Sequence, residues 1–196
     1  LTTLPETPDR IQRELTLLAL LRGPLMWTRG WGAPEVKQTL TRAFELSQHS
    51  EEAPQLFTVL YGWAAYYGNH AEYRTALELI ERCLRLADRN QDSGLRLMAD
   101  YMFQVFLAHR GELVQAREYC EQRLTQYDPT VHGALAFRFG MDPGVALTGY
   151  AALTAWYLGY PDHALTRARD TWTLAQDLSH PPSQAAGALL LSWVHL

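Results

Sequence analysis

Residues 57–87 read FTVLYGWAAYYGNHAEYRTALELIERCLRLA, and this stretch decides the fold. Apolar residues recur at helical spacing on both sides of Gly68-Asn69-His70, a run typical of a helix end. The stretch therefore predicts two amphipathic helices joined by a short turn. Small Ala64 lies midway along the first helix, and small Ala76 follows it by 12 residues. Small residues at these places allow two antiparallel helices to approach closely.

The rest of the chain repeats this unit. Ala76 follows Val36 by 40 residues, Ala116 follows Ala76 by 40, and Ala164 follows Ala116 by 48. The positions four and seven residues after these anchors are expected to be buried too: Leu40 and Ala43, Ile80 and Cys83, Cys120 and Arg123, Ala168 and Thr171. A two-helix repeat of this length predicts an all-α solenoid, because each pair needs its neighbours to bury its apolar stripe.

The repeat is loose in places. Arg123, a long cation, falls on an expected buried position. The positions twelve residues before the four anchors are not uniformly small: they are Pro24, Ala64, Gln104 and Ala152.

We expect one helical-repeat domain, residues 1–196, with about nine helices. The four expected helix pairs cover residues 8–49, 53–90, 94–127 and 145–179. An irregular insert, 128–144, lies between the third and fourth pairs, and an unpaired last helix covers 183–196. Gly23-Pro24 should interrupt or kink the first helix. The insert holds two Asp-Pro steps and three glycines, which predicts a loop or short helical turns.

The last helix should expose an apolar face because no partner helix follows it. That face predicts a homodimer or lattice contact through 183–196, or a contact with a further repeat. The chain starts at Leu1 rather than Met and ends at Leu196 within an apolar stretch. We therefore expect a fragment of a larger protein.

Composition excludes several classes of function. Hydrophobic residues make up 47% of the 196 residues, enough for a substantial core. The net charge of −4 offers no basic excess for nucleic acid. No apolar run reaches the roughly 18 residues of a membrane span. The two cysteines are too few for a disulfide framework, which favours a reducing cytoplasmic location.

Three stretches carry a resemblance to tetratricopeptide repeats (TPR). They are LYGWAAYY with ALELIERCL at 60–84, GELVQAREYCEQRL at 111–124, and GYPDHALTRARDTW at 159–172. The period is longer than the ideal length of about 34 residues. HEAT-like helix pairs therefore remain an alternative. The resemblance implies a right-handed superhelix.

A narrower resemblance covers nearly the whole chain. PLMWTRGWGAPEVKQTLTRAFEL at 24–46 and YDPTVHGALAFRFGMDPGVALTGYAALTAWYLGYPDHAL at 127–165 resemble the helical-repeat region of large bacterial signalling ATPases. In that family an AAA- or STAND-type ATPase often shares its polypeptide with a class III nucleotide cyclase, a kinase or a LuxR-type domain. The resemblance implies a sensory or scaffolding module and carries over no catalytic residue.

Motifs for catalysis or cofactors are missing from the sequence. It contains no GxxxxGK[ST] phosphate loop and no HxxxH or HExxH metal pair. His70, His109 and His180 fall near expected helix ends, where imidazoles cap carbonyls. Cys83 and Cys120 fall on inward stripes and are expected to be core thiols. We therefore expect no enzyme and no cofactor. An enzyme using Cys, His and Asp groups near Asp142 is the weakest alternative.

The expected partner-binding surface is apolar. In a TPR-like superhelix the first helices line the concave wall. Counting from the equivalent positions Ala64, Gln104 and Ala152, the wall residues are Tyr61, Ala65, Tyr101, Val105, Gly149, Leu153 and Trp156. Almost no Lys or Arg accompanies them, so an amphipathic helix or apolar segment suits this wall better than a carboxylate group.

The insert suggests a further hypothesis. It would fold over the concave face and bury its apolar side chains against Tyr101 and Trp156; those side chains are Val131, Leu135, Phe137, Phe139 and Met141. A mobile surface loop is the alternative. The leading function is a non-catalytic protein-interaction scaffold that binds a protein, a peptide or neighbouring domains of its parent. A small-molecule sensor with an apolar concave pocket is the second.

Overall fold

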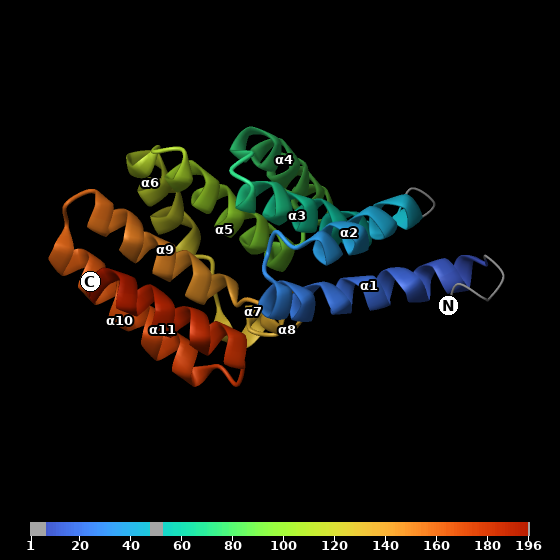
Figure 1. Cartoon of the computed structure of the whole chain (residues 1–196). Coiled ribbons are helices and arrows are strands. Elements are labelled where there is room, and N and C mark those ends of the chain that lie inside the picture. Colours follow the sequence, from blue (N-terminus) through green and yellow to red (C-terminus); the bar gives the residue numbers. More distant parts are fainter. Residues whose placement is uncertain (1–6, 48–52, 196) are drawn as a thin grey trace. The chain divides into compact units, whose positions relative to one another are not determined.

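The structure is a computed structural model that describes residues 7–47 and 53–195. Those residues form eleven α-helices and no strand, which confirms the all-α prediction (Figure 1). The helices are α1 (Pro8–Arg29), α2 (Pro34–Ser47), α3 (Ala53–Asn69), α4 (Tyr73–Asn90), α5 (Ser93–His109), α6 (Leu113–Leu124), α7 (Pro129–His132), α8 (Leu135–Phe139), α9 (Pro143–Tyr157), α10 (Pro161–Asp177) and α11 (Pro181–His195).

The nine long helices follow the predicted plan of pairs and a last helix. The insert 128–144 contains the two short helices α7 and α8, so of its two predicted forms the short helical turns are correct. The predicted domain start at residue 1, the end of the first pair at residue 49 and the last residue of 183–196 lie outside the described residues.

The chain divides into two compact units, residues 1–95 and 96–196, with the boundary inside α5. In the first unit α1 packs on α2, α2 on α3 and α3 on α4, and α1 also touches α3. One cluster of its core joins α1, α2 and α3 through Leu15, Ala43, Leu46 and Val59. Sequential packing of this kind is what a helical repeat requires.

In the second unit α9 is the central helix. It packs against α6, α10 and α11, and α10 also packs against α11. Every residue of α9 from Pro143 to Ala155 is buried except Tyr150. Gly149 allows this close packing, because a Cβ at that position would collide with the side chain of Leu190 on α11.

The predicted small-residue stripes are buried. On α4 the stripe is Ala76, Ile80 and Cys83, and on α10 it is Ala164, Ala168 and Thr171; each of these side chains is at most 1% exposed. The structure extends both stripes by one turn, to Ala87 and Ala175, which are buried to the same extent. The Cys83 thiol donates to the Phe57 carbonyl at 3.9 Å. These contacts confirm the predicted inward face of both second helices.

The predicted interruption of the first helix at Gly23-Pro24 is wrong. Helix α1 continues through Pro24 to Arg29. Pro24 lies on the exposed side, where solvent can satisfy the carbonyl that loses its intrahelical donor. The Pro24 carbonyl accepts a hydrogen bond from the Thr28 hydroxyl at 2.7 Å.

Candidate functional site

The seven residues predicted to form the partner-binding wall are mostly buried. Their exposed fractions are 3% for Tyr61, 2% for Ala65, 6% for Tyr101, 6% for Val105, 5% for Leu153 and 38% for Trp156. Gly149 is buried as well, so of the seven only Trp156 presents substantial surface. Contact of a partner with these positions therefore stays a prediction.

The insert buries only part of its apolar side chains. Phe139 and Met141 are buried, whereas Val131 is 64% exposed and Phe137 is 67% exposed. The Phe137 ring stacks edge-on against the His180 ring, with centroids 4.9 Å apart. The hypothesis that all five apolar groups are buried is therefore wrong for Val131 and Phe137, which lie on the outer side of these short helices.

A buried polar junction joins the starts of α9 and α11. Asp142 caps α9, since its Oδ1 accepts from the Val145 N–H at 2.9 Å. The backbone N–H of Asp142 donates to Ser183 Oγ at 2.9 Å. Ser183 Oγ lies 2.8 Å from His180 Nδ1. The Ser183 N–H donates to the same His180 nitrogen at 3.2 Å, so that nitrogen acts as an acceptor.

The electrostatics of the junction follow from its burial. Burial raises the pKa of Asp142. The hydrogen bonds from the Val145 N–H and the Tyr127 hydroxyl lower this pKa, but burial is the larger effect. Burial also lowers the pKa of His180. Asp142 and Ser183 are both 0% exposed. The junction brings Asp, His and Ser together, but it leaves Ser183 Oγ no surface for a substrate, so its role is to hold two helix starts together.

Tyr127 completes the junction from the end of α6. Its hydroxyl donates to Asp142 Oδ2 at 3.0 Å, and burial is the main cause that raises the pKa of this hydroxyl. A Cβ at position 144 would collide with the Tyr127 ring, which explains Gly144. His132 is buried, and its Nδ1 accepts from the Asp128 N–H at 3.0 Å. The two Asp-Pro steps of the insert are therefore helix starts: Asp128 caps α7 as Asp142 caps α9.

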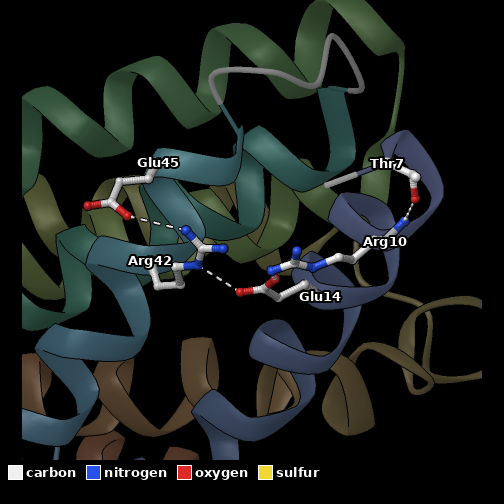
Figure 2. Close-up of polar contacts among 5 residues, drawn as sticks. All are labelled: Thr7, Arg10, Glu14, Arg42 and Glu45. Carbon is white, nitrogen blue, oxygen red and sulfur yellow. Dashed lines mark hydrogen bonds and ion pairs between the residues drawn. The ribbon is translucent and has the colours of Figure 1, made fainter. Parts of the chain in front are cut away.

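In the first unit a cluster of charges joins α1 to α2. Figure 2 shows Glu14 between the guanidinium groups of Arg10 and Arg42. Arg42 Nε donates to Glu14 Oε1 at 2.7 Å, and Arg10 Nη2 lies 3.6 Å from Glu14 Oε2. The hydrogen bond from Arg42 is the main cause that lowers the pKa of Glu14, against the opposing effect of burial. Arg42 also pairs with Glu45, 3.7 Å away.

Beside this cluster lies an open hollow of about 400 Å³ on α2. Its lining residues are Lys37, Gln38, Thr41, Arg42 and Glu45. The lining side chains are polar or charged, and Arg42 is already paired with two carboxylates. Because it is open, this hollow differs from the enclosed pocket that a small-molecule sensor requires.

A second buried carboxylate, Asp100, ties α5 to α6 within the second unit. Asp100 is 0% exposed and accepts from Arg96 Nε at 3.0 Å and from the Tyr119 hydroxyl at 2.6 Å. Arg123 Nε lies 3.7 Å from its other oxygen. Arg123, the long cation at an expected buried position of the repeat, thus forms an ion pair with the buried Asp100 carboxylate. Burial, reinforced by Asp100, raises the pKa of Tyr119 to about 12.

The two cysteines are buried free thiols. Burial raises the pKa of each to about 12, so both are protonated at neutral pH and neither is poised as a nucleophile.

Among the described residues, no three His, Cys, Asp or Glu side chains are grouped to hold a metal ion. No helix within residues 7–47 and 53–195 has both the length and the apolar character to cross a membrane.

The outer face of α11 is an exposed, uncharged surface with apolar side chains. One side of this helix is buried through Ser183, Ala186, Gly187, Leu190 and Val194. The other side is exposed; we call it the α11 face, and its residues are Ala185, Ala188, Leu189, Ser192 and Trp193. Leu189 is 48% and Trp193 is 44% exposed. No Asp, Glu, Lys or Arg occurs in α11. The predicted apolar face of the last helix is confirmed.

Helix α1 exposes apolar residues that the sequence analysis did not single out. Leu17, Leu20 and Leu21 are 53%, 58% and 48% exposed, and Trp27 is 40% exposed. They lie outside the periodic stripe of Ile11, Leu15 and Leu18 that packs into the core. The excess of leucines over what one stripe needs was the signal for this surface.

Comparison with known proteins places the fold. Two solved structures of a Podosopora anserina protein, described as a putative kinesin light chain with nearly identical TPR-like repeats, are similar to this chain. One of them, a point variant of that protein, aligns over 98% of this chain and 88% of the other, with a TM-score of 0.58 and 15% identity. The second aligns over 97% and 88%, with a TM-score of 0.57 and 16% identity. No family model and no curated protein matches the chain. At this identity the likeness shows the fold alone, a TPR-like helical repeat, and so confirms the predicted fold class.

Proposed function

We propose that the chain is a non-catalytic protein-interaction scaffold. The observation that carries this proposal is the α11 face, an exposed, uncharged apolar strip on a TPR-like fold. Burying exposed apolar surface stabilises an association by about 25 cal/mol per Å² before the costs of association are subtracted. The polar clusters around Glu14, Asp100 and Asp142 hold helices together, so recognition in this proposal relies on shape and apolar contact.

The wider context of the scaffold is also a proposal. The resemblance at 24–46 and 127–165 supports a place within a bacterial signalling ATPase or nucleotide cyclase in the cytoplasm. A homodimer through 183–196 stays a prediction that the α11 face is compatible with. The small-molecule sensor stays the second candidate, and the hollow on α2 does not support it, because that hollow is open.

Affinity capture with matched variants tests the scaffold. The immobilised wild-type chain should retain a reproducible set of proteins that the double variant Leu189→Glu/Trp193→Glu loses. The control is Val114→Glu on α6, which adds a charge at another exposed apolar residue, 59% exposed. That variant should retain the set. Identical sets for all three chains would contradict the proposal.

A further inference from the structure

The hydrogen bonds of His180 at the start of α11 require an imidazole without a hydrogen on Nδ1. The Ser183 backbone N–H donates to this nitrogen at 3.2 Å, and the Ser183 hydroxyl oxygen lies 2.8 Å from it. That oxygen accepts from the Asp142 N–H at 2.9 Å, so its own hydrogen can point to Nδ1. A neutral imidazole with its hydrogen on Nε2 satisfies both contacts. A hydrogen on Nδ1 would instead face the Ser183 N–H, donor against donor.

Two other histidines at helix ends lack this restriction. His70 Nδ1 lies 2.9 Å from the Tyr66 carbonyl oxygen, and His109 Nδ1 lies 2.7 Å from the Val105 carbonyl oxygen. A carbonyl oxygen only accepts, so each of these two nitrogens carries a hydrogen, and a charged imidazole keeps the bond. Both lie at C-terminal helix ends, where the helix dipole favours a positive charge. His180 lies at an N-terminal end, where the dipole opposes a positive charge.

The ionisable groups around His180 give a charged imidazole no ion-pair partner among the described residues. Asp142 turns its carboxylate oxygens to the Val145 N–H and the Tyr127 hydroxyl. His180 is 6% exposed, and its ring lies edge-on against Phe137. Burial lowers the pKa of His180, because the charged form loses its hydration there. The ionisable side chains of the surrounding segments are Asp142 before α9, Tyr127 after α6, Asp128 and His132 of the insert, Arg138 of α8 and Asp177 at the end of α10.

We propose that His180 is a pH switch: a proton on its Nδ1 turns the imidazole out of the junction and releases the start of α11 from the start of α9. The Ser183 N–H then loses its acceptor, and the Ser183 hydroxyl loses the partner that orients it toward the Asp142 N–H. The opening is local, because Leu190 and Val194 stay buried further along α11. The switch does not depend on the proposed interaction function.

Amide hydrogen exchange of the full chain, followed residue by residue by NMR, tests the switch. After correction for the intrinsic effect of pH on exchange, the Asp142 and Ser183 amides should exchange about tenfold faster at pH 5 than at pH 7. Their rates at pH 5 should change little in up to about 1 M urea, since a local opening exposes little surface. The rate of the Ala152 amide, in the buried middle of α9, should rise steeply with urea.

Two variants assign the response to one histidine. His180→Asn keeps a side-chain acceptor at the start of α11 but does not take up a proton in this pH range, so acid should not accelerate exchange of the two amides in this variant. His132 is the other buried histidine near the junction, and its Nδ1 accepts from the Asp128 N–H. His132→Asn should therefore keep the tenfold response.

Four results would overturn the switch. An acceleration that persists in His180→Asn, or one that disappears in His132→Asn, would assign the proton to another group. Equal urea dependence of the Ser183 and Ala152 amides would show that acid only favours unfolding of the whole unit. A titration of the His180 ring that leaves the exchange of both junction amides unchanged would show that the proton binds without opening the junction.

Discussion

The backbone N–H of Asp142 donates a 2.9 Å hydrogen bond to Oγ of Ser183, 41 residues later in the chain. Ser183 Oγ in turn lies against His180 Nδ1. One buried hydroxyl therefore fastens the starts of α9 and α11.

Replacing Ser183 should weaken the second unit. Ser183→Ala leaves the buried Asp142 N–H without its acceptor, which costs about 1–3 kcal/mol. Urea denaturation followed by circular dichroism measures the loss. The control is Ser192→Ala, because Ser192 is exposed and bonds only within its own helix, to the Leu189 carbonyl. Its effect should stay within about 0.5 kcal/mol. Equal losses in both variants would contradict a special role for Ser183.

The capping histidine makes stability depend on pH. Burial lowers the pKa of His180 below its ordinary value of 6.5 in the folded chain. The unfolded chain therefore takes up the proton first, so the stability from neutral His180 is complete above pH 6.5 and is lost as the pH falls below it. Urea midpoints measured from pH 8 to pH 5 should fall less steeply in His180→Asn than in the wild type. Parallel curves for the two proteins would refute this origin.

Gln104 should be replaceable with a gain in stability. Its side-chain amide is fully buried and makes no hydrogen bond of good geometry with any residue that the structure describes, although it lies near enough to Cys120 to lower that thiol's pKa. Gln104→Met keeps the volume and removes the buried amide, which should stabilise the fold by about 1 kcal/mol. Gln115→Met on the exposed side of α6 is the matched control and should be neutral. A loss of stability in Gln104→Met would show that the amide has a partner.

Glu14 should stabilise the first unit only while it is ionised. The hydrogen bond from Arg42 lowers the pKa of Glu14 below its ordinary value of 4.5. Its contribution is therefore present above pH 4.5 and is lost as the pH falls through the lower folded-state pKa. Glu14→Gln should cost on the order of 1 kcal/mol at pH 7 and less at pH 3. Thermal melts at both pH values measure this, and a pH-independent cost would contradict it.

Gly149 should tolerate no side chain while Leu190 is present. In most helices Gly→Ala stabilises by about 0.5–1 kcal/mol. At position 149 the new methyl group would collide with Leu190, and such overpacking costs about 1–3 kcal/mol. Gly149→Ala should therefore destabilise the wild type but stabilise a Leu190→Ala background. A double-mutant cycle without coupling between the two positions would exclude this contact.

The local parts of the fold could be predicted because they depend on short spacings. The stripe residues Ala76, Ile80 and Cys83 are spaced by four and three residues, so they share one face of a single helix. Periodicity alone therefore indicates that they are buried. The same reasoning identified α11 as a helix with an unpartnered apolar face. It also identified Asp-Pro steps as breaks in the pattern, which the structure shows to be helix starts.

The long-range parts could not be predicted for a physical reason. Periodicity tells which residues share a face, but not which other segment covers that face. Tyr61 and Tyr101 were assigned to an open wall for this reason, and the structure buries them. The bond from Asp142 to Ser183 and the ion pair of Arg123 with Asp100 depend on side chains from different helices meeting in space. No residue spacing in the sequence predicts these contacts between side chains of different helices.

The buried thiols give the molecule two built-in reporters of breathing motions. Cys83 belongs to residues 1–95 and Cys120 to residues 96–196, and each buried thiol donates a hydrogen bond to a backbone carbonyl of a neighbouring helix. A thiol-reactive dye can modify either cysteine only when the surrounding helices separate. The two labelling rates, read peptide by peptide in a mass spectrometer, would time the opening of each half of the chain independently, without any engineered probe.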